Sequence, residues 1–209
     1  MLEWYRLGFD HLQLMEEMDE LLSCILGTEK SEQISYQQLF INLLDIDPLT
    51  ASNEDLQKLV FDKANGPELS HRDEKLHCLF AVIIEPQLGK NRPLMVYDFP
   101  ASQSSLARIS ESDNRVAERF EVYYKGVELA NGFHELKDAD EQQKRFESDN
   151  DKRSLMGKQQ KPLDRRFLSA LKAGLPDCAG VALGIDRLLM LKLNKASISE
   201  VMPFPTDRA

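Results

Sequence analysis

Three charged side chains in two separate segments have the chemistry to bind a phosphate and a divalent cation. Glu121 and Glu128 flank a Lys125-Gly126 dipeptide, and Arg187 follows a run of small and apolar residues. Magnesium accepts a few carboxylate oxygens together with phosphate, and a guanidinium is a permanently charged fork that fits a phosphate or a purine face. The combination indicates nucleotide binding without a glycine-rich phosphate loop.

The segment that carries Arg187 supports this interpretation only together with the other segment. Residues 179–184 form a short apolar run spaced by small residues, on which a flat ligand could lie close to the backbone. Asp186 and Arg187 then open an apolar helical pattern. On spacing alone, a buried strand followed by a capped helix is the more frequent explanation.

The Lys125-Gly126 dipeptide predicts a two-residue hairpin turn. In that register Tyr123 faces Glu128, and Glu121 lies on the same sheet face as a diagonal neighbour. Two carboxylates on one face repel each other unless a cation or a substrate ammonium lies between them. The alternative is two solvated glutamates on an exposed face.

A second set of residues follows on the same strand but with the opposite parity. Asn131, Phe133 and Glu135 alternate with each other, whereas Glu128 falls on the other face. One pocket can contain all four only if the strand has a bulge between Glu128 and Asn131, and Gly132 makes such a bulge plausible. Without a bulge this is an ordinary edge strand.

Composition excludes several other classes of function. A formal net charge of −9 gives no broad basic face for nucleic acid. The three isolated cysteines make neither a zinc pattern nor a disulfide framework, which suits a reducing cytoplasm. The histidines lack a metal-binding spacing, and no Gly-x-Ser-x-Gly elbow supports a hydrolase triad. The chain shows neither a signal peptide nor a membrane-spanning apolar run.

Helical and strand patterns share the chain in a way that predicts an antiparallel α+β domain. Residues 10–26 predict a helix whose apolar stripe is Leu12, Met15, Met18, Leu22 and Ile25. Further helices are expected over residues 35–44, from Ser52, from Ser70 (with Leu76, Leu79, Phe80 and Ile83 inward), and over 140–153 and 163–173. Strands are expected over residues 93–100, 120–125, 127–133 and at the start of 179–191.

These residues resemble a known family. Residues 120–136 resemble the lysine-pocket region of class II lysyl-tRNA synthetases, and residues 180–187 resemble the third signature motif of class II synthetases. Residues 1–5 resemble the end of their second motif. The resemblance implies a class II synthetase-like catalytic domain, in which residues 1–209 form one partial domain and residues 30–90 a mostly helical, insertion-like segment.

The resemblance is stronger to the elongation factor P lysine ligases, which are synthetase paralogues that modify a translation factor. Ala182 stands where the lysyl-tRNA synthetases usually have glycine, and His134 stands where they usually have serine. The C-terminal residues 200–209 also resemble the paralogues. The added methyl group of Ala182 implies a pocket that favours (R)-β-lysine over α-lysine.

The resemblance implies a role for each residue of the amino-acid pocket. Glu3 and Tyr5 would contact the substrate amine or the amino-acid end. Asn131 and Phe133 would shape the pocket, and Glu135 would pair with the side-chain ammonium of lysine.

The resemblance also implies a nucleotide side of the site. Glu121 and Glu128 would hold Mg²⁺ with ATP, next to Gly184, and Arg187 would bind the phosphates. The amino acid would be activated as an adenylate and transferred to a lysine of elongation factor P. Positioning and charge neutralisation would carry this chemistry, with no covalent nucleophile.

The match begins inside the family's second motif, which leads us to expect a C-terminal portion of the catalytic domain with little or no adenylation activity alone. The family's first motif builds its dimer interface, so a homodimer is implied for the full-length family. Two alternatives stay open: a fragment of a lysyl-tRNA synthetase, and a non-catalytic module that binds a nucleotide or a partner. Neither a tRNA nor a membrane is an expected partner of the ligase.

Overall fold

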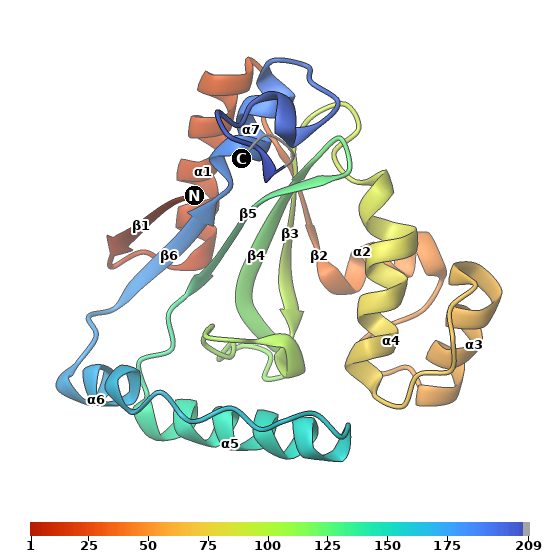
Figure 1. The fold of residues 1–209 in the computed structure, drawn as a ribbon, viewed down its shortest axis with the longest axis vertical. Coiled ribbons are helices and arrows are strands. Elements are labelled where there is room, and N and C mark those ends of the chain that lie inside the picture. Colours follow the sequence, from red (N-terminus) through yellow and green to blue (C-terminus); the bar gives the residue numbers. More distant parts are fainter. Residues whose placement is uncertain (207–209) are drawn as a thin grey trace.

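A six-stranded sheet forms the centre of the computed structural model, which describes residues 1–206 (Figure 1). Its strands lie in the order β1-β6-β5-β4-β3-β2. Their bounds are β1 (Leu2–Leu7), β2 (Glu32–Ser35), β3 (Leu94–Pro100), β4 (Val116–Tyr124), β5 (Val127–His134) and β6 (Cys178–Leu183). All neighbours are antiparallel except β2 and β3, which are parallel. The predicted α+β class is correct, but the short parallel strand β2 was not among the expected strands.

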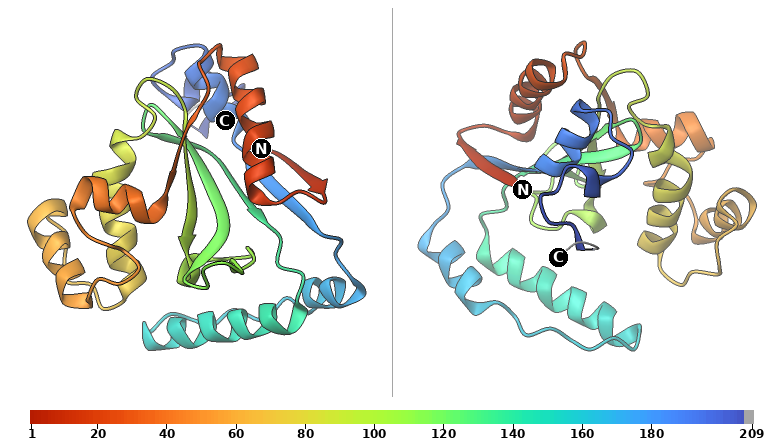
Figure 2. Two further views of the ribbon diagram at one scale, coloured as in Figure 1. Left: turned by 180° about the vertical axis from the view of Figure 1, so that it is seen from behind. Right: turned by 45° about the horizontal axis from the view of Figure 1, so that its top comes forward.

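One face of this sheet is packed against the first helix. Helix α1 (His11–Leu26) lies behind the sheet in Figure 1 and in front of it in the reverse view of Figure 2. Asp10 caps its N-terminus, and Gly27 ends it with a φ of 72°. The buried stripe starts at His11 and Leu14, so the expected inward position of Leu12, which is 45% exposed, is wrong.

The core on this face joins α1 to alternate residues of the strands. Its fully buried members include Met15, Met18, Phe120 and Val122. Helix α7 (Ile185–Lys192) adds Leu188 to the same cluster. Trp4 Nε1 and Arg6 Nε both donate to the Glu17 carboxylate, at 2.8 Å and 2.6 Å, which ties the edge strand β1 to α1.

A second core lies where a group of helices covers the opposite face near β2, β3 and the turn end of β4. The group comprises α2 (Tyr36–Leu44), α3 (Asn53–Ala64), α4 (Arg72–Leu79) and the short helices η1 (Phe80–Ile84) and η2 (Glu85–Gln87). Ser35 and Ser52 cap their helices as the sequence predicts, whereas α4 starts after His71 rather than Ser70.

Helix η1 is a π turn, which is one residue wider than an α turn. The wider turn brings Ile84 fully into the core, against which the expected Ile83 also packs while partly buried. It also sets the position of Glu85, which directly follows it.

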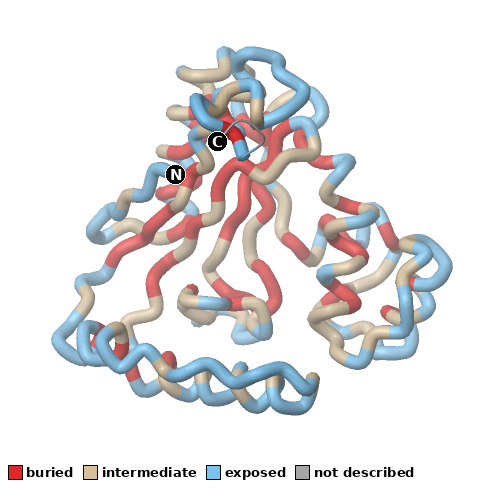
Figure 3. The backbone as a smooth tube through the Cα atoms, viewed as in Figure 1, coloured by how far each residue is buried: buried red, intermediate tan, exposed pale blue. Residues whose placement is uncertain are grey.

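Helices α5 (Ala139–Leu155) and α6 (Arg165–Ala173) form a separate arm across the end of the sheet (Figure 1). The rings of Phe146 and Phe167 pack together with centroids 6.0 Å apart. Figure 3 shows α5 exposed along most of its length, whereas the central strands are buried.

Helix η4 (Ile198–Glu200) follows α7 in the chain. Asp207, Arg208 and Ala209, the last residues of the C-terminal segment that resembles the paralogues, lie outside the described residues. Within residues 1–206, no helix combines the length and the apolar character that crossing a membrane requires.

Candidate active site

The register of the sheet brings most of the predicted site residues to one face. Lys125 and Gly126 both have positive φ, 52° and 72°, and form the predicted two-residue turn. The pairing then shifts between Val122 and Tyr123, so that Leu129 is the extra residue of β5. Leu129 joins the core of the α1 face, and the predicted bulge is present between Glu128 and Asn131.

This bulge aligns two rows of side chains across four strands on the face opposite α1. The first row is Glu121, Asn131, Ala182 and Glu3. The second row is Arg119, Phe133, Gly180 and Tyr5. Glu128 lies opposite Tyr123 on this same face, in the next row toward the turn.

Gly132 does not form the bulge, which corrects the expected reason for a glycine there. A Cβ on Gly132 would lie 2.6 Å from the Phe120 ring and 3.0 Å from the Gly180 carbonyl oxygen. The glycine is needed because the core side chain Phe120 packs directly on the backbone of β5.

Glu121 is enclosed by two partners on its own strand. It is only 8% exposed, and both the Arg119 guanidinium and the Tyr123 hydroxyl donate to its carboxylate. Arg119 also donates to Asn131 Oδ1, at 3.3 Å, and to the Gln103 carbonyl oxygen, at 2.8 Å. Burial raises the pKa of Glu121 although Arg119 opposes the shift. The enclosure fixes the direction of this carboxylate.

Glu128 has a different environment, because it is partly open and meets Arg187. Arg187 Nη1 donates to the Glu128 backbone oxygen at 2.7 Å and lies 3.3 Å from its carboxylate. The Gly184 amide donates to the Leu129 carbonyl oxygen at 2.8 Å, which holds the start of α7 against β5. Side-chain exposures of 48% for Arg187 and 35% for Glu128 leave both groups able to contact a ligand.

Glu135 lies two residues after Phe133, beyond the second row, and its carboxylate covers the backbone of β6. A Cβ on Gly180 would meet Glu135 Oε1 at 2.7 Å and the Tyr5 ring at 2.6 Å, so both groups cover this glycine closely. Burial raises the pKa of Glu135 to about 7. A carboxyl group whose pKa is raised this far by burial is a candidate functional group.

Two hollows of ligand size meet at Glu128. One has a volume of about 640 Å³ and includes Glu3, Asn131, Ala182 and Arg187 in its lining. The other has a volume of about 460 Å³ and is lined on the β4 side by Arg119, Glu121 and Tyr123, and on the helical side by His77 and Glu85. Because both are lined by Glu128, they adjoin each other over the sheet.

Two residues of this surface were missed at the level of sequence. Arg119 belongs to the same alternation as Glu121 and Tyr123, and that spacing could have placed it on the site face. Glu85 had no such signal, because its position depends on the π turn. Burial and the nearby charges of Glu128 and Glu121 raise the pKa of Glu85.

His134 lies on the opposite face from the pocket residues beside it. Its Nδ1 is 2.6 Å from Glu118 and its Nε2 is 3.4 Å from Asp177. Hydrogen bonding to Glu118 raises the pKa of His134. His134, one of the two residues that favoured the ligases over the lysyl-tRNA synthetases, is therefore part of an ion network outside the pocket.

Comparison with known proteins gives this geometry a family. The class II tRNA synthetases (D, K and N) match residues 1–208. The chain belongs to this family. It is similar to two proteins named elongation factor P--(R)-beta-lysine ligase, from Salmonella typhi (54% identical) and Proteus mirabilis strain HI4320 (55% identical). The similarity covers 100% of this chain and 65% of each relative.

In this member of the family, two segments that resemble the family's motifs meet at one junction of the sheet. The strand and helix that resemble the third motif, β6 and α7, contact the hairpin β4–β5 through Arg187 and Gly184. The strand that resembles the end of the second motif, β1, pairs with β6 along its whole length. Three segments far apart in the sequence thus share one face.

Proposed function

We propose that this chain forms the ATP and amino-acid site of a ligase that activates a lysine-type amino acid as an adenylate. The proposal places residues 1–209 in one partial catalytic domain, with residues 30–90 as its helical insertion. The observation that carries it is the arrangement of charge on one sheet face. An acidic and guanidinium cluster at the turn end of the hairpin and a buried lone carboxylate at its other end match a polyphosphate and an ammonium.

The cluster around Glu128 is the nucleotide end. Arg187 and Arg119 supply planar cations for phosphate oxygens. No group of three or more His, Cys, Asp or Glu in residues 1–206 is arranged to hold a metal ion alone. Glu121 and Glu128 instead fit a magnesium ion that also takes oxygens from phosphates, a coordination typical of that ion. When bound, magnesium neutralises phosphate charge.

The region around Glu135 is the amino-acid end. Its carboxylate would pair with the terminal ammonium of a lysine chain, while Phe133 lies along the methylene groups. Glu3 and Tyr5 would contact the second amine. The Ala182 methyl group occupies the first row between Asn131 and Glu3, and it favours (R)-β-lysine, whose amine is one carbon further from the carboxylate than in α-lysine.

These residues then act by positioning. The amino-acid carboxylate attacks the α-phosphorus of ATP, the bond to the bridging oxygen breaks, and pyrophosphate leaves. An acceptor amine next attacks the carbonyl carbon of the mixed anhydride and loses a proton, and AMP leaves. Holding both substrates on one rigid sheet lowers the entropic barrier, and the guanidinium groups offset the developing charge.

We assign elongation factor P as the acceptor, in place of a tRNA. The names of the two relatives support this assignment. The net charge of −9 also offers little general attraction for a polyanionic tRNA.

Calorimetric titration of the 209-residue chain tests the proposal. We expect ATP binding that depends on magnesium, and tighter binding of (R)-β-lysine than of α-lysine. Ala182→Gly should reduce or reverse that preference and leave ATP binding unchanged. Absence of magnesium-dependent ATP binding would indicate a non-catalytic module, and a preference for α-lysine would indicate a lysyl-tRNA synthetase.

A further inference from the structure

A strongly basic segment stands out on this acidic protein. Between Lys152 and Lys172 the chain has seven lysines and arginines and a single acidic residue, Asp164, although its formal net charge is −9. The seven are Lys152, Arg153, Lys158, Lys161, Arg165, Arg166 and Lys172. They span the end of α5, the following loop and α6, and none belongs to the site described above.

Most of these cations have no acidic partner. Lys152 lies 3.6 Å from Asp149, and Lys172 lies 3.4 Å from Asp140. For the other five, no ion pair occurs among residues 1–206, and all five except Arg153 are exposed. Unpaired exposed cations of one sign create a local positive potential, which steers and orients an acidic partner.

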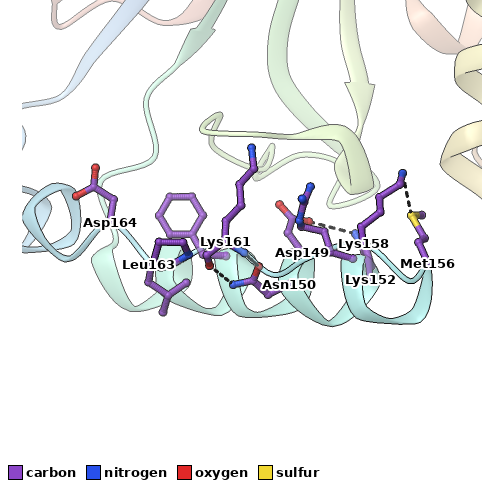
Figure 4. Close-up of a pocket in the computed structure, with 11 residues that line it drawn as sticks. Asp149, Asn150, Lys152, Met156, Lys158, Lys161, Leu163 and Asp164 are labelled. Carbon is purple, nitrogen blue, oxygen red and sulfur yellow. Dashed lines mark hydrogen bonds and ion pairs between the residues drawn. The ribbon is translucent and has the colours of Figure 1, made fainter.

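The basic segment surrounds a hollow of about 490 Å³ between α5 and the loop (Figure 4). Its lining combines apolar groups such as Phe146 with four lysine and arginine side chains and two acidic ones, Asp149 and Asp164. In Figure 4, Lys158 and Lys161 extend from the loop toward the side on which the sheet lies. An apolar floor with a basic rim fits a folded acidic protein surface with apolar side chains.

This hollow continues toward the active site through two neighbours. It shares Asp149 and Lys152 with a polar hollow of about 330 Å³ beside Ser102 and Ser105. That hollow shares Ser105 and Asp149 with the one that contains Glu121. Adjoining hollows therefore lead from the basic loop to the hollow that contains Glu121.

The helix that carries this surface is fixed to the loop beside the site. Arg145 Nη1 donates to the carbonyl oxygens of Ala107, at 2.7 Å, and Ser105, at 3.2 Å. Partner residues bound at α5 would thus be held at a defined distance from the site.

We propose that the basic surface of residues 152–172 docks the acidic face of the acceptor protein, so that its acceptor lysine reaches the site over this concave path. The inference rests on the proposed function, because it needs a protein acceptor. A nucleic acid fits less well, since the aromatic rings here, Phe146 and Phe167, pack against each other and offer no platform for bases.

The test measures the binding of elongation factor P to the 209-residue chain by interferometry at low and at moderate salt. We expect Lys158→Glu with Lys161→Glu to weaken binding at least tenfold and to flatten its salt dependence. The matched control, Lys58→Glu with Lys63→Glu on α3, makes the same change in net charge at exposed positions away from the arm. It should bind almost as tightly as the unmodified chain.

The outcomes separate docking from the proposed activity. Magnesium-dependent ATP binding should be equal in all three proteins, because neither pair of lysines lies in the site. Unchanged binding of the 158/161 variant, equal losses in both variants, or no binding by the unmodified chain would each overturn the docking surface. A mixed-sequence RNA that binds this segment in place of the protein would also overturn it. Loss of ATP binding in the unmodified chain would instead contradict the proposed function.

Discussion

The two faces of strand β4 have opposite environments although their residues alternate along nine consecutive positions. Phe120 and Val122 are fully buried beneath α1, whereas Glu121 and Tyr123 form a hydrogen-bonded pair on the other face. The first face packs the strand against α1, whereas on the second face Glu121 lies between the second core, which includes Tyr123, and the partly exposed Glu128. On the partner strand β5, the extra residue Leu129 shifts the alternation, so that Glu128 and Asn131 lie on the same face. The comparison teaches that stability and chemistry can be changed separately here.

The largest expected effect is on the core face. Phe120→Ala removes a fully buried ring that touches Gly132, and we expect it to lower the free energy of unfolding by about 3–5 kcal/mol. Denaturant unfolding measures this loss. Glu121→Gln, one residue away on the site face, should cost less stability but weaken magnesium-dependent ATP binding. Equal losses of stability in the two variants would contradict the separation of the faces.

The same substitution at two glycines gives the next contrast. Gly132→Ala forces a Cβ against the Phe120 ring and the Gly180 carbonyl, so it should lower the free energy of unfolding by about 1–3 kcal/mol. Gly180→Ala meets the edge of the Tyr5 ring and the Glu135 carboxylate instead. Tyr5 is 60% exposed and can move, so this variant should unfold almost normally but bind a lysine-type ligand at least tenfold more weakly. Titration calorimetry with thermal unfolding of both variants checks the pair.

The contrast between the faces also explains what the sequence could predict. The Ser52 cap and the Lys125-Gly126 turn depend only on residues next to them in the sequence. The sequence therefore predicts both elements correctly. The mismatch in parity between Glu128 and Asn131 required a bulge, and the pairing has one at Leu129. Sequence reasoning attributed it to Gly132, because the close approach of Phe120 is a tertiary contact that no local pattern contains.

Other parts of the site depended on contacts between distant segments. The place of Glu85 follows from a π turn and from packing of the helical group against the sheet, so its approach to Glu128 had no local signal. The parallel strand β2 is similar, because its four residues end at the helix cap Ser35 and give no strand pattern of their own. The proposed docking surface on residues 152–172 includes the ends of two expected helices, but its position relative to the site depends on contacts such as that of Arg145 with Ala107.

A smaller effect is expected from the partly open pair at the nucleotide end. Arg187→Ala should weaken ATP binding by about tenfold to a hundredfold, because a charge-assisted phosphate contact is lost. The free energy of unfolding should change by less than about 1 kcal/mol, since exposed ion pairs contribute little. Arg187→Lys, which keeps the charge but not the fork, should give an intermediate affinity. A large loss of stability in Arg187→Ala would place this residue in the structural part of the molecule.

The last contrast concerns pH at the other end of the site. An acid whose pKa is raised on folding, as Glu135 from 4.5 to about 7, binds more protons in the folded state between those values. The free energy of unfolding should therefore decrease as pH rises through this window and level off above it. Binding of a lysine-type ammonium needs the ionised carboxylate, so affinity should follow the opposite trend.

This opposite trend can be measured directly. Ligand affinity should increase by no more than about tenfold per pH unit up to pH 7 and then become constant, because the ligand ammonium itself keeps its charge over this range. Glu135→Gln should remove both dependences at once, with weak binding and an unfolding free energy that lacks this decline. Affinity that stays constant from pH 5 to 8 in the unmodified chain would show that another group pairs with the ammonium. The carboxylate that pairs with the ligand ammonium would then be that of the exposed Glu3 beside Ala182.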